Sequence, residues 1–313
     1  MLSWLTYRYV EQPARNSRWR IPPAKVFAVA GGAIVGMALL GISVRFLDGI
    51  PQRLRPEVAG LNAAAEELNP FQVKCVIKSL AMLRSEGPCI LGDAQADKLT
   101  ILWGDSHAAA LMPALDKIGR EAGMRVAVFA RGHCAPISGL VPPYNELVMF
   151  KICSKSNKFV QDYIKANRPE FVLMAAVWSQ YRLPLEFSRN IASTLNVLSE
   201  SNTQAFLFLE VPSYSGGPKA WARQAVSGRI SKQDISNLST MPVNLHRQET
   251  KAVAEVLKSH FGTRVIDPAD FLCRRDGVCR MFEGATWYYV DGQHLSLAGA
   301  VAVSPLLANA FSF

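Results

Sequence analysis

The residues best suited to chemistry begin with a serine that follows a short apolar segment. KLTILW, residues 98–103, leads directly into GDSH, residues 104–107, and small residues follow. This pattern predicts a strand, a turn that carries Ser106, and then a helix. At the carboxyl edge of an open α/β sheet, where ligands bind, such a hydroxyl lies beside the N–H groups of the next helix. Ser106 is therefore a candidate nucleophile, although the same position also suits a simple helix N-cap.

A second motif, DGQHLS near the C-terminus, supplies the groups that a serine nucleophile needs. Asp291 and His294 are three positions apart, and in a turn that enters a helix such residues face the same side. The carboxylate can accept a hydrogen bond from one imidazole nitrogen, which leaves the other nitrogen to remove the Ser106 proton. Because a serine hydroxyl is a poor nucleophile without such a base, the two motifs together predict a catalytic triad of Ser106, His294 and Asp291.

All six cysteines lie after residues 26–44, an uncharged apolar segment that could carry the rest of the chain out of the cytoplasm. An even number of cysteines in an exported domain favours disulfides, and six cysteines allow fifteen pairings. A zinc site is the alternative, but there is no C-x-x-C pair and histidine is scarce, so no metal is expected. Pairing between sequence neighbours is the simplest prediction, and it joins Cys75 with Cys89, Cys134 with Cys153, and Cys273 with Cys279.

Residues 26–44 form an uncharged apolar run that is long enough to cross a bilayer as a helix. A signal peptide and a buried core helix are the alternatives, but a signal peptide usually has a shorter charged start and a shorter apolar stretch. The segment before the run is the more basic flank, so the positive-inside rule places residues 1–25 in the cytoplasm and the chain after about residue 45 outside. This flank also accounts for part of the net charge of +9. No nucleic-acid motif accompanies that charge, and a nucleic-acid partner is not expected.

The chain divides into a short N-terminal segment (1–21), a transmembrane helix (22–45), a linker rich in Pro, Ala and Glu (46–70) and a catalytic domain (71–313). In the last segment, short apolar runs alternate with helical patterns, which predicts an α/β fold: a three-layer α/β/α sandwich with a central parallel sheet. Residues 212–244 look like a loop and are a candidate lid. The expected strands are 99–103, 125–130, 171–178, 205–211 and 264–266, and the expected helices are 107–122, 155–167, 184–200, 246–261 and 296–309.

The combination of GDS after the first strand with D-x-x-H-L-S near the end resembles the SGNH/GDSL hydrolase superfamily over about residues 71–313. The resemblance implies a flavodoxin-like SGNH fold. The order Ser, Asp, His also suits an α/β-hydrolase, but that fold places G-x-S-x-G after several strands. Here Ser106 follows the first strand, and Ala108 stands where the second glycine is expected.

GDSH, the N-terminal run SWLTYRYVEQPAR (residues 3–15) and the order of spanning helix, linker and domain resemble one subgroup more closely. This subgroup comprises the periplasmic SGNH domains fused to acyltransferase family 3 membrane proteins, which O-acetylate O-antigens or exopolysaccharides. The resemblance implies an inner-membrane, single-pass chain with a periplasmic catalytic domain and a polysaccharide acceptor. It implies no bound cofactor, since a membrane acyltransferase domain supplies an acyl donor derived from acetyl-CoA. Residues 1–21 resemble a cytoplasmic remnant of the end of that membrane domain. The rest of the domain would precede Trp4, so we expect it to be missing from the chain or split off as a partner.

The family builds its oxyanion hole from the N–H of the nucleophile, a glycine after the second strand and an asparagine after the third. Ser106 supplies the first donor, and Gly132 is the candidate for the second, although an ordinary turn glycine suits that position equally well. The asparagine is absent, so the hole has two donors or takes a substitute from residues 178–180. Polar and aromatic residues near the expected site are candidates for lining the substrate: His107, Trp178, Ser179, Gln180, Tyr181 and Trp287.

Three functions remain compatible with these residues. The first, which the resemblance favours, is O-acylation, most simply O-acetylation, of a cell-surface polysaccharide through an acyl-enzyme on Ser106. The second is a carbohydrate or lipid esterase, in which water replaces the sugar hydroxyl. The third is a glycan-binding remnant without catalytic activity, which the absent asparagine keeps open.

Overall fold

The computed structural model describes residues 2–12, 22–47, 56–77, 79–139, 146–181, 187–261 and 264–311, and the chain divides into two compact units, 1–55 and 56–313. In the first unit, α1 (Leu2–Thr6) and the π-helical η1 (Tyr7–Glu11) precede α3 (Pro23–Phe46). Within the described residues, α3 is the one helix that is both long and apolar enough to cross a membrane; its mean hydropathy is 2.2, and none of that apolar stretch is buried. Residues 13–21 of the predicted N-terminal segment lie outside the described residues.

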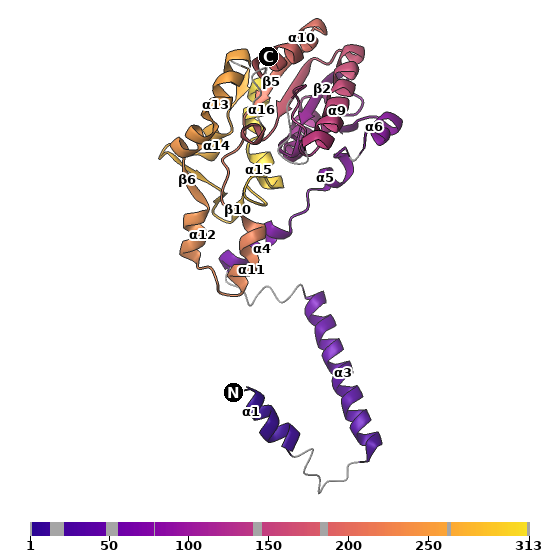
Figure 1. Ribbon diagram of the computed structural model, residues 1–313, viewed down its shortest axis with the longest axis vertical. Helices are drawn as coiled ribbons and strands as arrows, with labels where there is room; N and C mark the ends of the chain where they lie inside the picture. Colours follow the sequence, from indigo (N-terminus) through magenta and orange to yellow (C-terminus); the bar gives the residue numbers. More distant parts are fainter. Residues whose placement is uncertain are drawn as a thin grey trace. The chain divides into compact units, whose positions relative to one another are not determined.

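A six-stranded sheet forms the middle of the second unit (Figure 1). All its strand pairs are parallel except the pair between β1 and β3 at one edge. The apolar runs form these strands because helices cover both faces of the sheet. This confirms the predicted α/β class with a mainly parallel sheet, whereas the antiparallel edge strand was not predicted. In spatial order the strands are β1 (Cys89–Gly92), β3 (Met124–Ala130), β2 (Lys98–Gly104), β4 (Phe171–Ala175), β5 (Gln204–Phe208) and β7 (Val265–Ile266).

Two separate hydrophobic cores flank the sheet. Successive side chains of a strand point to opposite faces, so Leu102 of β2 enters one core while Ile101 and Trp103 enter the other. The sheet and its two helical layers form the expected three-layer sandwich. The Leu102 side holds α7 (Ser106–Ala110), α8 (Met112–Glu121), α15 (Leu297–Ala302) and α16 (Ser304–Phe311), and the other side holds α9 (Glu146–Asn167), α10 (Phe187–Glu200) and α13 (Val243–Phe261).

Two segments that the sequence analysis expected to be irregular contain helices. The expected linker, 46–70, includes α4 (Pro56–Glu66), which packs on α11 (Pro218–Val226) and buries Leu61 completely. The candidate lid, 212–244, contains α11 and α12 (Lys232–Leu238), so most of it is ordered secondary structure. Short helices show weak periodicity and gain most of their stability from packing, which explains why the pattern of the sequence missed them.

Three disulfides lie in the second unit, and their pairing is the predicted one between sequence neighbours. They join α5 (Pro70–Cys75) to β1, the loop after β3 to α9, and the end of α14 (Ala269–Leu272) to β8 (Val278–Arg280). The loop after β3, which carries Gly132, is therefore tied covalently to α9. Smaller elements complete the unit: α6 (Leu80–Glu86), η3 (Trp178–Gln180), β6 (Thr240–Pro242), β9 (Phe282–Glu283) and β10 (Thr286–Trp287).

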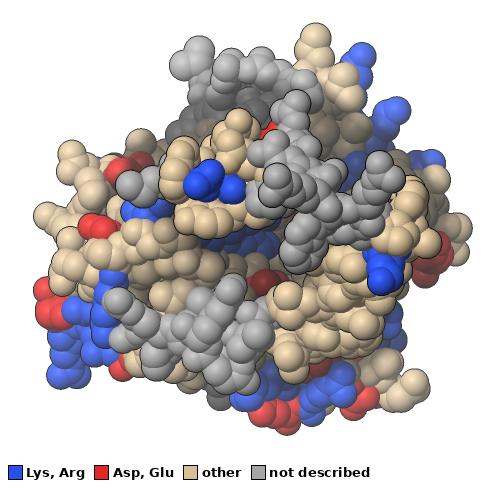
Figure 2. Space-filling view, turned by 90° about the horizontal axis from the view of Figure 1, so that it is seen from below, with Lys and Arg blue, Asp and Glu red and all other residues tan. Residues whose placement is uncertain are grey.

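The charged side chains of the described surface are mixed in sign. On the face drawn in Figure 2, Lys and Arg side chains lie scattered among acidic and uncharged ones. Exposed ion pairs also join opposite charges in the second unit, as between Arg280 and Asp276 and between Lys158 and Asp162. Pairs of this kind contribute little to stability because water screens them.

Candidate active site

Ser106 begins α7 directly after β2, which is the strand-to-helix turn that the sequence predicted. The turn requires glycine before it. A Cβ atom at Gly104 would collide with the carbonyl oxygen of Ala175 on the neighbouring strand and with the methyl group of Ala108. The sequence GDSH therefore lets β2 approach β4 closely and places the Ser106 hydroxyl at the carboxyl edge of the sheet.

Asp105 holds this turn in place and is not part of the triad. Its side chain caps α7 by accepting a hydrogen bond from the His107 N–H at 2.8 Å. The other carboxylate oxygen accepts bonds from the Val177 N–H at 3.1 Å and from the Tyr181 hydroxyl at 2.9 Å. Asp105 is buried, so these bonds replace its contacts with water and tie the nucleophile turn to the loop after β4.

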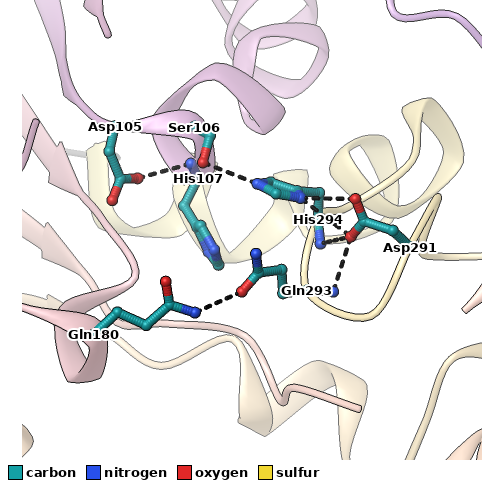
Figure 3. Close-up of polar contacts among 7 residues, drawn as sticks. All are labelled: Asp105, Ser106, His107, Gln180, Asp291, Gln293 and His294. Atoms are coloured by element: carbon teal, nitrogen blue, oxygen red, sulfur yellow. Dashed lines mark hydrogen bonds and ion pairs between the residues drawn. The ribbon is translucent and has the colours of Figure 1, made fainter. Parts of the chain in front are cut away.

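His294 and Asp291 reach Ser106 from the loop that precedes α15, although Ser106 is 188 positions away in the chain (Figure 3). The imidazole Nε2 of His294 lies 2.8 Å from the Ser106 Oγ. The Nδ1 of the same ring lies 2.9 Å and 3.1 Å from the two carboxylate oxygens of Asp291. The three side chains form one continuous line of hydrogen bonds from carboxylate to hydroxyl.

The Asp291 carboxylate is held in its ionised form. Burial acts to raise its pKa, but hydrogen bonds from the His294 imidazole and from the N–H groups of Gln293 and His294 outweigh burial and lower the pKa to about 2. An ionised carboxylate only accepts hydrogen bonds, so it favours a proton on Nδ1 of His294. The Nε2 atom is then free to accept the proton of the Ser106 hydroxyl.

The loop that carries Asp291 rests on residues 213–217, SYSGG, from the candidate lid. The Tyr214 N–H donates to the Gly292 carbonyl at 2.8 Å. A Cβ atom at Gly292 would approach the Tyr214 carbonyl oxygen too closely, and one at Gly217 would collide with the backbone of Asp291. The two loops need glycine at these positions in order to pack, so SYSGG supports the Asp291 turn. This supporting role of SYSGG was not predicted from the sequence.

On the opposite side of Ser106, the turn η3 follows β4, where the resemblance led us to expect an asparagine. Trp178 and Tyr181 are buried: the Trp178 indole N–H donates to the Phe208 carbonyl at 3.0 Å, and the Tyr181 hydroxyl is bonded to Asp105. The Ser179 N–H donates to the Glu210 carboxylate at 2.9 Å. The polar groups of Trp178 and Tyr181 are used inside the protein, and a role for these two residues in lining the substrate stays a prediction.

Gln180 is the residue of this turn that points toward the triad (Figure 3). Its amide nitrogen donates to the side-chain oxygen of Gln293 at 2.8 Å. Gln293 lies between Asp291 and His294 in DGQH, but it was not among the predicted site residues. We call this contact between Gln180 and Gln293 the amide bridge.

His107 lies on the same side as the amide bridge. Its ring centroid is 5.1 Å from that of His294, and the two rings are tilted by 50°. Burial lowers the pKa of His107 to about 4, against the opposing attraction of Asp105, so the ring is neutral at physiological pH. The structure therefore places two candidate lining residues, His107 and Gln180, beside the His294 base.

Gly132 and Trp287 are the last two of the predicted site residues. Gly132 occupies the loop after β3, which starts beside the nucleophile turn because the Arg131 N–H donates to the Gly104 carbonyl at 2.9 Å. Its contribution to an oxyanion hole stays a prediction. Trp287 is buried and stacks on Phe282, with ring centroids 4.6 Å apart, where it lines a cavity of about 360 Å³ that contains no residue of the triad.

Comparison with known proteins places the second unit in a family. No curated protein matches the chain significantly. Among solved structures, the periplasmic domain of a lipopolysaccharide acetyltransferase from Salmonella ser. Paratyphi A is similar, with a TM-score of 0.55 and 17% sequence identity; the match covers 75% of this chain and 90% of that one. At this identity the similarity shows a shared fold. The family of SGNH domains fused to AT3 domains matches residues 74–309, three quarters of the chain, and the chain therefore belongs to that family.

Proposed function

We propose that the chain is a serine O-acyltransferase that transfers an acyl group, most simply acetyl, to a hydroxyl of a cell-surface polysaccharide. The observation that carries the proposal is the 2.8 Å contact between His294 Nε2 and Ser106 Oγ, continued by His294 Nδ1 to Asp291. Family membership and the acetyltransferase domain of similar fold support acyl transfer to lipopolysaccharide or a related polymer.

The reaction proceeds in two halves that use the same base. Ser106 Oγ attacks the carbonyl carbon of the acyl donor while His294 Nε2 takes the hydroxyl proton and passes it to the leaving group. An ester on Ser106 results. The acceptor hydroxyl then attacks this ester, His294 takes its proton, and that proton returns to Ser106 as the acylated sugar leaves. The Ser106 N–H at the start of α7 and the Gly132 N–H are the proposed donors to the oxyanion in both halves.

The membrane arrangement is part of the proposal. The length and apolar character of α3 support an anchor in the inner membrane, and the three disulfides support an oxidising, periplasmic location for the second unit. A reporter enzyme that is active only in the periplasm is expected to be active when it is fused after residue 313. Activity of a reporter that works only in the cytoplasm would contradict the topology.

The acyl donor is proposed to come from a membrane acyltransferase domain, since the family is defined by fusion to AT3 domains. This domain would load the acyl group, derived from acetyl-CoA, on the membrane side, and the second unit would need no cofactor of its own. Co-purification of the tagged chain with an AT3 membrane protein from its native host would support this step. Acylation of Ser106 by acetyl-CoA alone would contradict it.

The test of the function uses the purified full chain in detergent with p-nitrophenyl acetate as donor. Release of p-nitrophenol reports acylation, and mass spectrometry of an added saccharide reports transfer. Transfer to the saccharide that disappears in Ser106→Ala supports the acyltransferase. Ser106-dependent release of acetate alone would instead establish an esterase, and the absence of any Ser106-dependent turnover would refute both enzymes.

A further inference from the structure

His107 carries a hydrogen-bonding atom that the protein itself leaves unused. The Nε2 atom of its imidazole is buried and has no hydrogen-bond partner among the described residues. The residue as a whole is only 6% exposed. Most buried polar atoms in folded proteins are paired, so an unpaired one beside a nucleophile points to a partner that arrives with a ligand.

The amide bridge lies next to this atom. Figure 3 shows the tip of the His107 ring directed toward Gln180 and Gln293. The two glutamines come from different loops: Gln180 ends η3, and Gln293 belongs to the turn of Asp291. Their mutual contact is solvent-exposed, and among the described residues the Gln180 carbonyl oxygen and the Gln293 amide nitrogen have no further partner. An exposed bond between two neutral amides opens easily, because water replaces it at little cost.

We propose that His107, Gln180 and Gln293 form the acceptor subsite, which binds neighbouring hydroxyl groups of the sugar when the amide bridge opens. The inference rests on the proposed function and names the part of the site that recognises the acceptor. It also gives the orphaned Nε2 atom a partner. The reacting hydroxyl then lies beside His294, whose ring is 5.1 Å from that of His107.

A sugar fits these three groups better than an apolar or anionic ligand does. A neutral imidazole nitrogen either donates or accepts, and a hydroxyl group pairs with it in both cases. Each glutamine offers a donor and an acceptor, which match two adjacent hydroxyls. His107 is neutral, so it offers no positive charge to a phosphate or carboxylate. Water satisfies the same atoms one at a time, whereas a sugar holds several hydroxyls in fixed relative positions, which favours transfer over hydrolysis.

The first test measures how the acetyl group on Ser106 is divided between sugar and water. The full chain in detergent is supplied with p-nitrophenyl acetate and a mixture of the methyl glycosides of glucose, galactose and mannose. In His107→Leu the ratio of transfer to hydrolysis is expected to fall by about tenfold or more, and in Gln180→Ala and Gln293→Ala by about threefold to tenfold. His107→Gln keeps a polar group and is expected to retain more of the ratio than His107→Leu.

Two controls separate this result from misfolding. Labelling of Ser106 with a fluorophosphonate counts the active protein in each variant, and rates are divided by that count. Gln224→Ala removes an exposed glutamine whose amide only bonds its own helix, and it is expected to leave the ratio unchanged. An unchanged ratio in His107→Leu and in both glutamine variants would overturn the acceptor subsite while the acyltransferase function stands.

The second test needs no reaction. The Ser106→Ala chain is labelled with 15N-histidine, and the His107 resonances are assigned by their loss in the double variant that also carries His107→Leu. The glycosides are expected to shift the His107 imidazole 15N resonance and to leave that of His260, on the far end of α13, in place. If the wild-type protein transfers no acetyl group to sugar, the proposed function fails, and this titration alone decides the subsite. A His107 resonance that none of the three glycosides shifts overturns it.

Discussion

The two sides of Ser106 differ in how completely their polar groups are paired. On the Asp291 side, the carboxylate accepts bonds from a side chain and two backbone N–H groups, and His294 uses both of its ring nitrogens. On the His107 side, one imidazole nitrogen has no partner among the described residues, and two glutamines bond to each other through a solvent-exposed contact.

The Asp291 side is thus organised before a ligand binds, whereas the His107 side is left to be completed by the ligand. A triad must hold its base and nucleophile in register through both half-reactions, so pre-organisation there accelerates each step. A subsite for an acceptor has to release one molecule and admit the next, so weak internal contacts are an advantage. Variants on the two sides are therefore expected to change different quantities.

The largest effect on the rate of acyl transfer is expected when the nucleophile, Ser106, is replaced. Ser106→Ala removes the atom that carries the acyl group and is expected to lower acyl transfer by about 10⁴-fold or more, because the remaining groups provide only residual catalysis. Initial rates with p-nitrophenyl acetate measure the loss. Ser259→Ala, which removes an exposed hydroxyl on α13, is the matched control. A fall of less than tenfold in Ser106→Ala would mean that another group is the nucleophile.

A smaller loss is expected when the orientation of the base is disturbed. In Asp291→Asn the amide can donate to Nδ1 of His294, so the ring proton shifts to Nε2 and the ring no longer accepts from Ser106. The expected fall in kcat is about 10²- to 10⁴-fold at neutral pH. The affinity for the acceptor should change little, since the acceptor subsite is intact.

The control for this variant is Asp276→Asn, which alters an exposed carboxylate bonded to Arg280. It is expected to keep wild-type kcat. If Asp291→Asn retained most of its activity, the proposed orientation of His294 by the carboxylate would be wrong.

The organised side was the more predictable of the two. Asp291 and His294 are three positions apart, so local geometry alone brings them together, and GDSH after an apolar strand places a hydroxyl at the sheet edge. The parallel sheet followed from its uninterrupted apolar runs. The amide bridge joins residues 113 positions apart, and no local pattern predicts such a contact.

The burial of two aromatic residues, the helix α4 and the strand β1 could not be predicted from the sequence, because tertiary packing determines them. Trp178 and Tyr181 have types that suit both sugar stacking and burial, and only the partners Phe208 and Asp105 show that they are buried. The helix α4 falls in a segment rich in Pro, Ala and Glu, and α11 supplies the surface on which it packs. The antiparallel β1 is a short strand whose pairing with β3 is set by tertiary structure.

The third prediction concerns Asp105, whose side chain connects the nucleophile turn to the loop after β4. Asp105→Ala would leave three donors in the interior without their acceptor: the N–H groups of His107 and Val177 and the Tyr181 hydroxyl. The expected loss of unfolding free energy is roughly 3–5 kcal/mol, measured by urea denaturation of the detergent-solubilised chain. Asp162→Ala, which removes an exposed ion pair with Lys158, should cost less than about 0.5 kcal/mol. Equal losses in the two variants would contradict the role of Asp105.

The smallest effect concerns Glu210, which holds the η3 turn through the Ser179 N–H. Burial raises the pKa of this carboxyl from 4.5 to about 7, so between these values the folded chain binds a proton that the unfolded chain has lost. The unfolding free energy therefore falls as the pH rises from about 5 to about 8, and the contribution of this one group is about 2–3 kcal/mol. Glu210→Gln keeps an acceptor for Ser179 and removes the titration. Urea denaturation is expected to give similar stabilities for the two proteins at pH 5, which serves as the internal control, and a more stable variant at pH 8. The same stability difference at both pH values would show that Glu210 does not titrate in the interior, and that its hold on the turn beside the acceptor subsite does not depend on pH.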